Sequence, residues 1–478
     1  MDIVGLPRST GDDVTNRGTT RRGVFGALAG AAAATALTAE PAGAAGSDER
    51  PFQARPGSSK RPNILFILAD DLGWADLSSY GSPDIETPHL DRLAKGGVRF
   101  TDGYSSGAVC SPTRVAFYTG RYPGRTAGGL PEPIGSVNER DGIPASHPTL
   151  ASLLKAAGYA TALFGKWHGG FLPNFSPLRV GWDEFFGNYS GGVDYYSKYS
   201  HMGEYDLYEG ETPVENDGRY YTDVIADRAE SFVRRKHSAP WLLNLNFTSP
   251  HWPWEAPGDR AVSEEITARI KAGDSQAIFH RDGGSLQTYR KMVENLDRRI
   301  GQVLTALRET GQERDTLVIF QSDNGGERFS YNWPLSGNKA SLNEGGIRVP
   351  TILRWPARVR GGQVSHVPVV THDWTATLLE IAGAKPHPEY PLDGASLAGY
   401  LLRGAEAPER DLFWRTRANR ALRRGKWKYL RLSATGGDAL YDIENDPREQ
   451  ANLAAKHPQL VAELRARWEE IDAPQLRY

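Results

Sequence analysis

Five apolar runs recur along the first three quarters of the chain, and stretches with helical spacing separate them. The runs are residues 63–71, 159–168, 241–251, 316–326 and 350–356. Among the stretches between them, residues 147–158 end in a glycine typical of a helix stop, and residues 289–309 repeat apolar positions at helical spacing. Strands that alternate with amphipathic helices predict an α/β sheet with helices on both faces.

The pattern changes in the last quarter of the chain. A helical stretch at 371–383 is followed by short alternating segments at 411–447, which are typical of an antiparallel meander. A last amphipathic helix is predicted from about Pro458 to Ile471. We therefore expect a large domain at residues 62–365 and a smaller C-terminal α+β subdomain, with an antiparallel sheet, at residues 366–478.

Reactive side chains end or follow four of the five apolar runs. They are Asp70, Asp71, Lys166, His168, His251, Asp323 and Asn324. Taken singly, each has an ordinary structural explanation, because acidic pairs and Asn-Gly stretches form helix caps and turns, and a histidine after a strand is often structural. In open α/β sheets, however, ligands bind at the carboxyl ends of the strands. The joint placement of these side chains therefore predicts that they converge in one crevice.

The donor atoms in this set indicate which kind of metal ion it suits. Asp70, Asp71, Asp323 and Asn324 supply only carboxylate and amide oxygens. Such a set suits a hard divalent cation, Ca²⁺ or Mg²⁺. It suits Zn²⁺ poorly, because no histidine or thiolate belongs to it.

Composition and charge limit the classes of partner. The chain has 56 basic and 58 acidic residues, a formal net charge of -2 and no long basic run. A nucleic-acid partner or an anionic membrane surface therefore has no support in the composition. With 39% hydrophobic residues among 478, the chain is long and apolar enough for a large buried core.

The N-terminal segment differs in kind from the rest of the chain. Arg21 and Arg22 precede an Ala-rich, mildly apolar stretch at about 24–39, which is followed by small residues suited to signal-peptidase cleavage. This pattern resembles a twin-arginine export signal. The stretch is shorter than the roughly 20 apolar residues that span a bilayer, so no stable membrane anchor is expected. We predict an export signal at 1–46, a linker at 47–61, and a periplasmic or secreted location.

Cys110 is the only cysteine in the chain. A lone cysteine in an exported protein forms no internal disulfide. Its polar, proline-containing surroundings argue against the common role of a small buried hydrophobic residue. A thiolate is also a soft ligand that suits Ca²⁺ or Mg²⁺ poorly. The sulfur of Cys110 is therefore not expected to be the acting group.

The residues around Cys110 resemble the signature of type I sulfatases. Residues 110–114, CSPTR, fit the Cys-x-Pro-x-Arg pattern of that family, and VAFYTGRYP after them resembles its Thr-Gly-Arg segment. Further segments are similar to sulfatase motifs, in the family's order: ADDLGW (69–74), GKWH (165–168), SPHWP (249–253), SDNGG (322–326), GNKASLNEGGIRVP (337–350) and LYDIENDPREQANLA (440–454). The resemblance covers roughly residues 61–478. It implies an alkaline-phosphatase-like fold, in which helices sandwich a large mixed sheet.

Two positions depart from the family pattern. Gly169 stands where the family commonly has leucine, and Thr113 replaces the more usual serine of the modification motif. Neither change removes a predicted functional group.

The resemblance implies a sulfuric ester hydrolase of the arylsulfatase type, whose nucleophile is made from the cysteine. In this family a formylglycine-generating enzyme oxidises the cysteine to Cα-formylglycine, and the hydrated aldehyde attacks the sulfur of the ester. Asp323 would help to deprotonate this hydrate. The implied ligands of one Ca²⁺, or alternatively Mg²⁺, are Asp70, Asp71, modified Cys110, Asp323 and Asn324.

The same resemblance implies roles for the remaining site residues. Arg114 would hold the formylglycine oxygen and the neighbouring carboxylates in place. Lys166 and Lys339 would contact the sulfate oxygens of the substrate. His251, with Lys339, would bind the substrate and protonate the leaving oxygen. His168 would take the proton from the remaining hydroxyl of the hydrate, so that sulfate is released.

Both an aryl sulfate and a sulfated carbohydrate fit this interpretation, and the aromatic-rich segments 171–222 and 252–288 are expected to wall the pocket. An alternative is a phosphate or phosphonate monoester hydrolase on the same scaffold, although two-zinc phosphatases need further histidine ligands. A catalytically silent binding protein, with Cys110 as a thiol, leaves the complete set of polar groups without a role. A Cys-His acyl hydrolase leaves the carboxylate cluster and both lysines unexplained.

Overall fold

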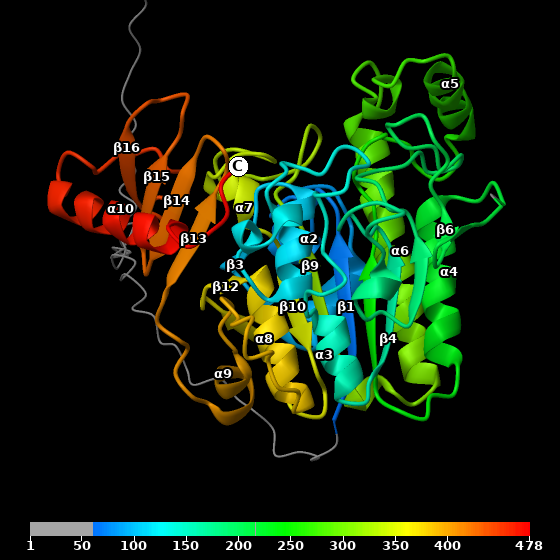
Figure 1. Cartoon of the computed structure of the whole chain (residues 1–478), viewed down its shortest axis with the longest axis horizontal. Helices are drawn as coiled ribbons and strands as arrows, with labels where there is room; N and C mark the ends of the chain where they lie inside the picture. The colour runs from blue at the N-terminus through cyan, green and yellow to red at the C-terminus, as the bar shows by residue number, and fades with distance from the viewer. Residues whose placement is uncertain (1–60, 216) are drawn as a thin grey trace, which may run out of the picture. The chain divides into compact units, whose positions relative to one another are not determined.

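The computed structural model describes residues 61–215 and 217–478 (Figure 1). The predicted export signal at 1–46, and the predicted linker at 47–61 except Arg61, lie outside the described residues. Among the helices of the described part, none is long and apolar enough to cross a membrane.

A ten-stranded sheet forms the centre of the described part, in the order β11-β2-β10-β9-β1-β8-β4-β5-β6-β7. Its strands are β1 (Asn63–Ala69), β2 (Val98–Phe100), β4 (Ala160–Gly165), β5 (Glu184–Gly187), β6 (Tyr208–Glu209), β7 (Thr212–Pro213), β8 (Trp241–Asn246), β9 (Thr316–Ser322), β10 (Thr351–Arg354) and β11 (Gln363–Ser365). The five central strands β9, β1, β8, β4 and β5 are parallel, whereas β10 runs antiparallel to β9. The sheet is therefore mixed, and all five predicted apolar runs contain one of its strands.

Helices cover both faces of this sheet, as the alternating pattern predicts (Figure 1). Ile64, Phe66 and Leu68 of β1 point to one face, and Leu65 and Ile67 point to the other. The first face packs against α2 (Cys110–Thr119), α3 (Leu150–Ala156), α8 (Thr371–Ala382) and α9 (Ala398–Arg403). The second face packs against α1 (Pro88–Lys95), α4 (Tyr221–Arg234) and α6 (Leu286–Glu309). Strands buried on both faces explain why their sequences read as continuous apolar runs.

The C-terminal part contains the expected antiparallel meander and final helix. Its four strands pair in chain order and are β13 (Asp411–Arg415), β14 (Arg420–Arg424), β15 (Trp427–Arg431) and β16 (Asp438–Asp442). One face of this sheet packs against α10 (Pro458–Asp472) through Leu464 and Trp468. Its other face packs against Ala108 and Leu342, which belong to segments near the predicted site. Helix α8, which we grouped with this part, packs on α2 beside the large sheet.

The remaining elements are one helix of 12 residues, α5, and several short segments. They are β3 (Gly103–Tyr104), β12 (Val369–Val370), α5 (Arg260–Lys271), α7 (Glu344–Ile347) and 3-10 helices at Ser78–Tyr80, Pro123–Arg125, Ala127–Gly129, Pro177–Val180, Ala277–Phe279 and Glu313–Asp315. β3 and β12 pair with each other in parallel and form a separate two-stranded sheet.

Candidate active site

The carboxyl ends of the parallel strands bring the predicted residues to one edge of the large sheet. Asp70 directly follows β1, Lys166 directly follows β4, and Asp323 directly follows β9. His251 lies five residues after the end of β8. Cys110 is the first residue of α2, which packs on the same sheet. All five side chains are buried.

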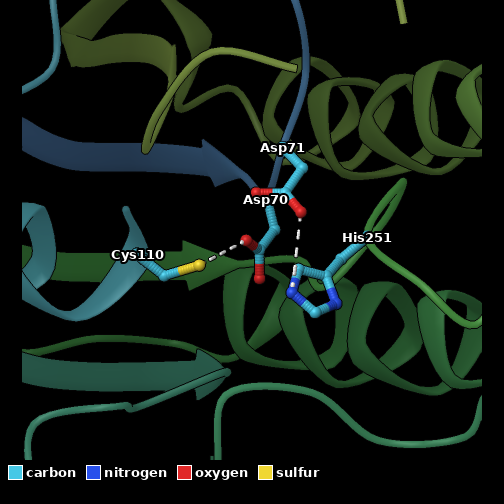
Figure 2. A group of neighbouring side chains, drawn as sticks. All are labelled: Asp70, Asp71, Cys110 and His251. Carbon is cyan, nitrogen blue, oxygen red and sulfur yellow. Dashed lines mark hydrogen bonds and ion pairs between the residues drawn. The ribbon is translucent and has the colours of Figure 1, made fainter. Parts of the chain in front are cut away.

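Asp70 contacts both the cysteine and two basic side chains of the site. The thiol of Cys110 donates to Asp70 Oδ1 at 3.3 Å (Figure 2). Lys166 Nζ lies 2.5 Å from Asp70 Oδ2, and Arg114 Nη2 lies 3.5 Å from the same oxygen. The Asp70 carboxylate therefore faces the cysteine on one side and two cations on the other.

Asp71 contacts a second group of site residues. Lys339 Nζ lies 2.6 Å from Asp71 Oδ2, and the amide of Asn324 donates to Asp71 Oδ1 at 2.7 Å. His251 Nε2 lies 3.6 Å from Asp71 Oδ2, and Figure 2 shows the imidazole pointing at this carboxylate. Lys339 follows no strand, as Cys110 and Arg114 of α2 do not, and the structure still brings it into the cluster.

Arg114 joins the cysteine helix to the third carboxylate. It lies one helical turn after Cys110, so both side chains leave α2 on the same face. Its Nε and Nη2 donate to Asp323 Oδ2 at 3.0 and 2.9 Å, and its Nη1 donates to Lys166 O at 3.1 Å. Asp323 Oδ1 in turn accepts from the backbone N–H of Asp71 at 3.3 Å. This fully buried guanidinium fixes two strand ends relative to the cysteine.

The crowding of three carboxylates shifts their pKa values in different directions. Burial would raise the pKa of Asp70, but Lys166 and the other nearby cations outweigh it and hold that pKa well below its usual range. Burial raises the pKa of Asp71 to about 8 against the opposing effect of Lys339, and the charge of Asp70 adds to the rise. Burial and Asp70 also raise the pKa of Asp323 to about 6. The nearby cations therefore do not fully stabilise the ionised forms of Asp71 and Asp323.

The two site histidines are buried in the neutral form, each with one ring nitrogen engaged. Burial and Lys339 hold the pKa of His251 well below its usual range, and burial and Lys166 do the same to the pKa of His168. His251 Nδ1 donates to Trp252 O at 2.8 Å, which leaves Nε2 toward Asp71. His168 Nε2 donates to Ile134 O at 2.9 Å, which leaves Nδ1 buried and without a hydrogen-bond partner among the described residues.

Oxygen donors in the cluster are available for a cation. The ligand atoms of Asp70, Asp71, Cys110 and His251 lie within 4.8 Å of one another. Asn324 Oδ1 is buried and has no hydrogen-bond partner among the described residues. A buried amide oxygen without a donor is costly unless something positive satisfies it. The carboxylates, with raised pKa values at two of them, and this free oxygen fit a hard divalent cation.

The thiol of Cys110 is unsuited to act as a thiolate. Burial, reinforced by the charge of Asp70, raises its pKa well above its usual range. It therefore stays protonated near neutral pH.

Thr113 and Gly169, the two departures from the family pattern, are explained by local contacts. The Thr113 hydroxyl donates to Gly107 O at 3.1 Å and accepts from Gly107 N at 2.9 Å, two bonds that serine can also make. A Cβ at Gly169 would lie 2.6 Å from Cζ2 of the Trp167 indole, so this backbone excludes leucine unless the ring moves.

Sequence analysis missed two contacts of the site. Glu327 Oε2 lies 3.4 Å from Lys339 Nζ, and its position directly after the Asp-Asn-Gly-Gly stretch is a signal that could have suggested it. Ser111 Oγ accepts from Ile134 N at 2.9 Å and so helps to hold the residue whose carbonyl oxygen accepts from His168. No sequence pattern links residues this far apart, so this second contact had no signal.

Comparison with known proteins identifies the family. The sulfatase family model matches residues 62–384, and the model for N-sulphoglucosamine sulphohydrolase, C-terminal, matches residues 337–473. N-acetylgalactosamine-6-sulfatase of Rattus norvegicus is 33% identical over 404 residues, which are 78% of this chain and 72% of that protein. Arylsulfatase A of Homo sapiens is 31% identical over 429 residues, 85% of this chain and 82% of the relative.

A solved structure agrees with the sequence relatives. The structure of Ps i-CgsB has a TM-score of 0.74 at 31% identity, and the match covers 86% of this chain and 92% of that one. The fold, the buried cluster at the strand ends and the family matches lead to the same conclusion, and the predicted resemblance is confirmed. The chain belongs to the sulfatase family of the alkaline phosphatase superfamily, and it is a sulfatase, an enzyme that hydrolyses sulfate esters.

Proposed function

We propose that this sulfatase cleaves sulfate monoesters of carbohydrates with a formylglycine made from Cys110 and one divalent cation, Ca²⁺ before Mg²⁺. The observation that carries the proposal is the contact of the Cys110 thiol with Asp70 at 3.3 Å, inside a cluster of oxygen donors and cations. A protonated thiol in that place is a poor nucleophile, whereas the hydrated aldehyde derived from it supplies an oxygen nucleophile.

The cation would be held by Asp70, Asp71, Asp323 and Asn324 together with the modified Cys110. When bound, such an ion draws charge from the sulfate oxygens and favours ionised ligands. The raised pKa values of Asp71 and Asp323 and the unpaired Asn324 Oδ1 support a cation here, because each is a group that a positive charge would satisfy.

The basic residues of the chain bind and orient the anionic group. Lys166 and Lys339 end in ammonium groups within 2.6 Å of the Asp70 and Asp71 carboxylates, and these point charges can also contact sulfate oxygens. Arg114 stays on Asp323 and Asp70, so it positions the modified residue and the strand ends.

The two histidines move protons at different atoms. His251 Nδ1–H is fixed on Trp252 O, so Nε2 is the atom that carries a proton to the leaving alcohol oxygen. A bound sulfate group favours this protonation by its negative charge. His168 keeps its proton on Nε2 toward Ile134 O, so its buried Nδ1 is the atom that accepts a proton when sulfate is released.

A sulfated carbohydrate is our first choice of substrate class and an aryl sulfate the second. Ps i-CgsB, a solved relative at 31% identity, was crystallised with k-i-k-neocarrahexaose. In this chain the centroids of the Trp252 and His251 rings lie 4.0 Å apart. Lys339 Nζ lies 5.8 Å from the centroid of the Trp252 ring. An aromatic face beside the proton-carrying histidine suits a sugar ring or an aryl group.

The deciding experiment combines peptide mass and turnover. The tryptic peptide of residues 100–114 should have the mass of the aldehyde in active enzyme, and a chelator should remove activity that Ca²⁺ restores. An aryl sulfate should be turned over faster than the matching aryl phosphate. An unmodified thiol in active enzyme would overturn the mechanism, and faster phosphate turnover would favour the phosphate or phosphonate ester hydrolase.

We further propose that the chain is exported after a formylglycine-generating enzyme has modified it. The basis is the pair Arg21-Arg22 together with Cys110, since a route that exports folded protein would carry a finished site outward. The test is the location of the protein after Arg21→Lys and Arg22→Lys. Unchanged secretion would contradict the twin-arginine route.

A further inference from the structure

Lys339 lies in a loop of residues 336–344, which we call the lysine loop. Its backbone is hydrogen-bonded to two other segments that carry predicted site residues. Lys339 N–H donates to Gly326 O at 3.1 Å, and Ala340 N–H donates to Ala108 O at 2.8 Å. Both acceptors lie two residues from predicted metal ligands. The position of the loop therefore determines where the Lys339 ammonium meets the substrate.

The carboxylate of Glu449, in the C-terminal part, accepts hydrogen bonds from both ends of the lysine loop. Its Oε2 accepts from Ser336 Oγ at 2.5 Å, from Asn343 Nδ2 at 3.1 Å and from Glu344 N at 2.8 Å. Ser336 begins the loop, and the other two donors end it. Glu449 is 8% exposed, so water does not compete for these bonds.

Lys428 of β15 makes the burial of this carboxylate possible. Its ammonium lies 2.8 Å from Glu344 Oε1 and 2.8 Å from Glu449 Oε1, and its side chain is 0% exposed. A buried carboxylate without a partner is strongly destabilising, and one lysine here serves two of them. The C-terminal sheet thus reaches the lysine loop through the buried Lys428 ammonium as well as through its apolar packing on Leu342.

We propose that Glu449 and Lys428 are positioning residues for Lys339. Neither side chain touches the reacting atoms; each acts through the lysine loop, which the C-terminal part holds where Lys339 reaches Asp71 and the sulfate. This inference rests on the role of Lys339 under the proposed function. It gives the segment LYDIENDPREQANLA, to which no step of the reaction is assigned, a part in catalysis.

A double-mutant cycle in an aryl sulfate assay tests the proposal. Glu449→Gln keeps the size of the side chain and removes its charge, and we expect it to lower kcat by about 10- to 100-fold. In the Lys339→Ala background the same change should lower kcat by less than about two-fold, because the positioned group is already gone. Glu444→Gln, the same substitution at an exposed position five residues earlier, is the matched control.

Hydrogen exchange of a peptide covering residues 336–344 gives a readout independent of turnover. Glu449→Gln should speed exchange at the Lys339 and Ala340 amides, and Glu444→Gln should not. If Glu449→Gln fails to fold, Ser336→Ala removes one of the three bonds to the carboxylate and should show the same two effects at smaller size.

Two results would overturn the inference, and they are distinguishable. An equal loss from Glu449→Gln with and without Lys339 would mean that Glu449 acts other than through the lysine. Unchanged exchange in the loop would have the same meaning. Wild-type turnover by Lys339→Ala would instead overturn the proposed role of Lys339, and the inference with it.

Discussion

Two buried groups of charges in this enzyme have the same composition and opposite electrostatic character. The site cluster contains three carboxylates and three cations: Asp70, Asp71, Asp323, Arg114, Lys166 and Lys339. The C-terminal network also contains three of each: Asp102, Glu344, Glu449, Arg348, Arg423 and Lys428. In the first group the pKa of Asp71 rises to about 8, and in the second the pKa of Glu344 falls to about 2.

The arrangement of the charges explains this difference. Burial favours the neutral carboxyl in both groups, but in the C-terminal network two cations each bridge two carboxylates, whereas among the six site residues only Arg114 does so. Lys428 lies between Glu344 and Glu449, and Arg348 lies between Glu344 and Asp102. In the site cluster the carboxylates face one another, and their mutual repulsion raises the pKa values of Asp71 and Asp323. A network that is satisfied holds structure together, and one that is left short of positive charge is ready to bind a cation.

Replacing one buried lysine in each group should give the largest effects, and the two effects should differ in kind. Lys166→Met is expected to lower kcat/KM by about 10²- to 10³-fold, because the enzyme loses a positive charge that contacts the sulfate group of the substrate. Its effect on stability should be the smaller one, since Asp70 keeps Arg114. Lys428→Met leaves two buried carboxylates without their shared partner and should lower the free energy of unfolding by about 3–5 kcal/mol. Its effect on turnover, which acts through the lysine loop, should be smaller than that of Lys166→Met. Urea unfolding and turnover per folded molecule measure both, and a reversed pattern would refute the assignment.

His251 provides a second test of the difference, because we assign proton transfer to the site cluster and not to the C-terminal network. His251→Ala should lower kcat about 10²-fold on a sulfate ester with a basic leaving alcohol. A nitrophenyl sulfate, whose leaving group needs little help, should lose much less. The measurement is the dependence of log kcat on the pKa of the leaving group. An equal loss across the series would remove His251 from proton transfer.

The opposite pKa shifts predict opposite pH dependences of stability. Asp71, whose pKa rises from 3.8 to about 8, binds more protons in the folded state, so its contribution to stability falls as pH rises between these values. Glu344, whose pKa falls from 4.5 to about 2, contributes stability above pH 4.5 that is lost as pH falls toward 2. In metal-free enzyme, Asp71→Asn should remove a loss of up to about 1.4 kcal/mol per pH unit.

Urea unfolding of both forms between pH 5.5 and 8 checks this prediction. The buried neutral histidines work in the other direction below about pH 6.5, so the variant must be compared with the wild type at each pH. Ca²⁺ should make the two proteins differ less in slope, because it favours the ionised carboxylate. The same slope in both metal-free proteins would contradict the raised pKa of Asp71.

Much of the fold was predictable because burial on both sheet faces leaves a strong pattern. Each expected apolar run contains a strand, and the reactive residues at the strand ends meet because parallel strands end at one edge. The direction of β10 was not predictable, since a short strand of four residues has the same pattern in either direction. The two-residue strands β6 and β7 are too short to leave a pattern.

The site was predictable to the extent that its residues follow strands. Lys339 follows none, and only the resemblance to sulfatases pointed to it. The Lys428–Glu449 ion pair left no signal, because a buried pair between separate segments has no period in the sequence, and Glu449 was indicated only as part of the family-like segment 440–454. Whether the boundary after residue 365 separates two folding units stays a prediction, since α8 packs with α2 whereas the meander begins at Asp411.

Replacing Thr113 by serine should give the smallest effect, because the hydrogen bonds of Thr113 are made by its hydroxyl group, which serine also has. Both hydrogen bonds to Gly107 survive in Thr113→Ser, and only a buried methyl group is lost, a change worth about 0.8 kcal/mol. Turnover per converted molecule should stay within about two-fold of wild type. The fraction of the 100–114 peptide that carries the aldehyde separates conversion from catalysis. A higher fraction with unchanged turnover would place the cost of threonine in the modification step, whereas a ten-fold change in turnover per aldehyde would show that the methyl group shapes the site.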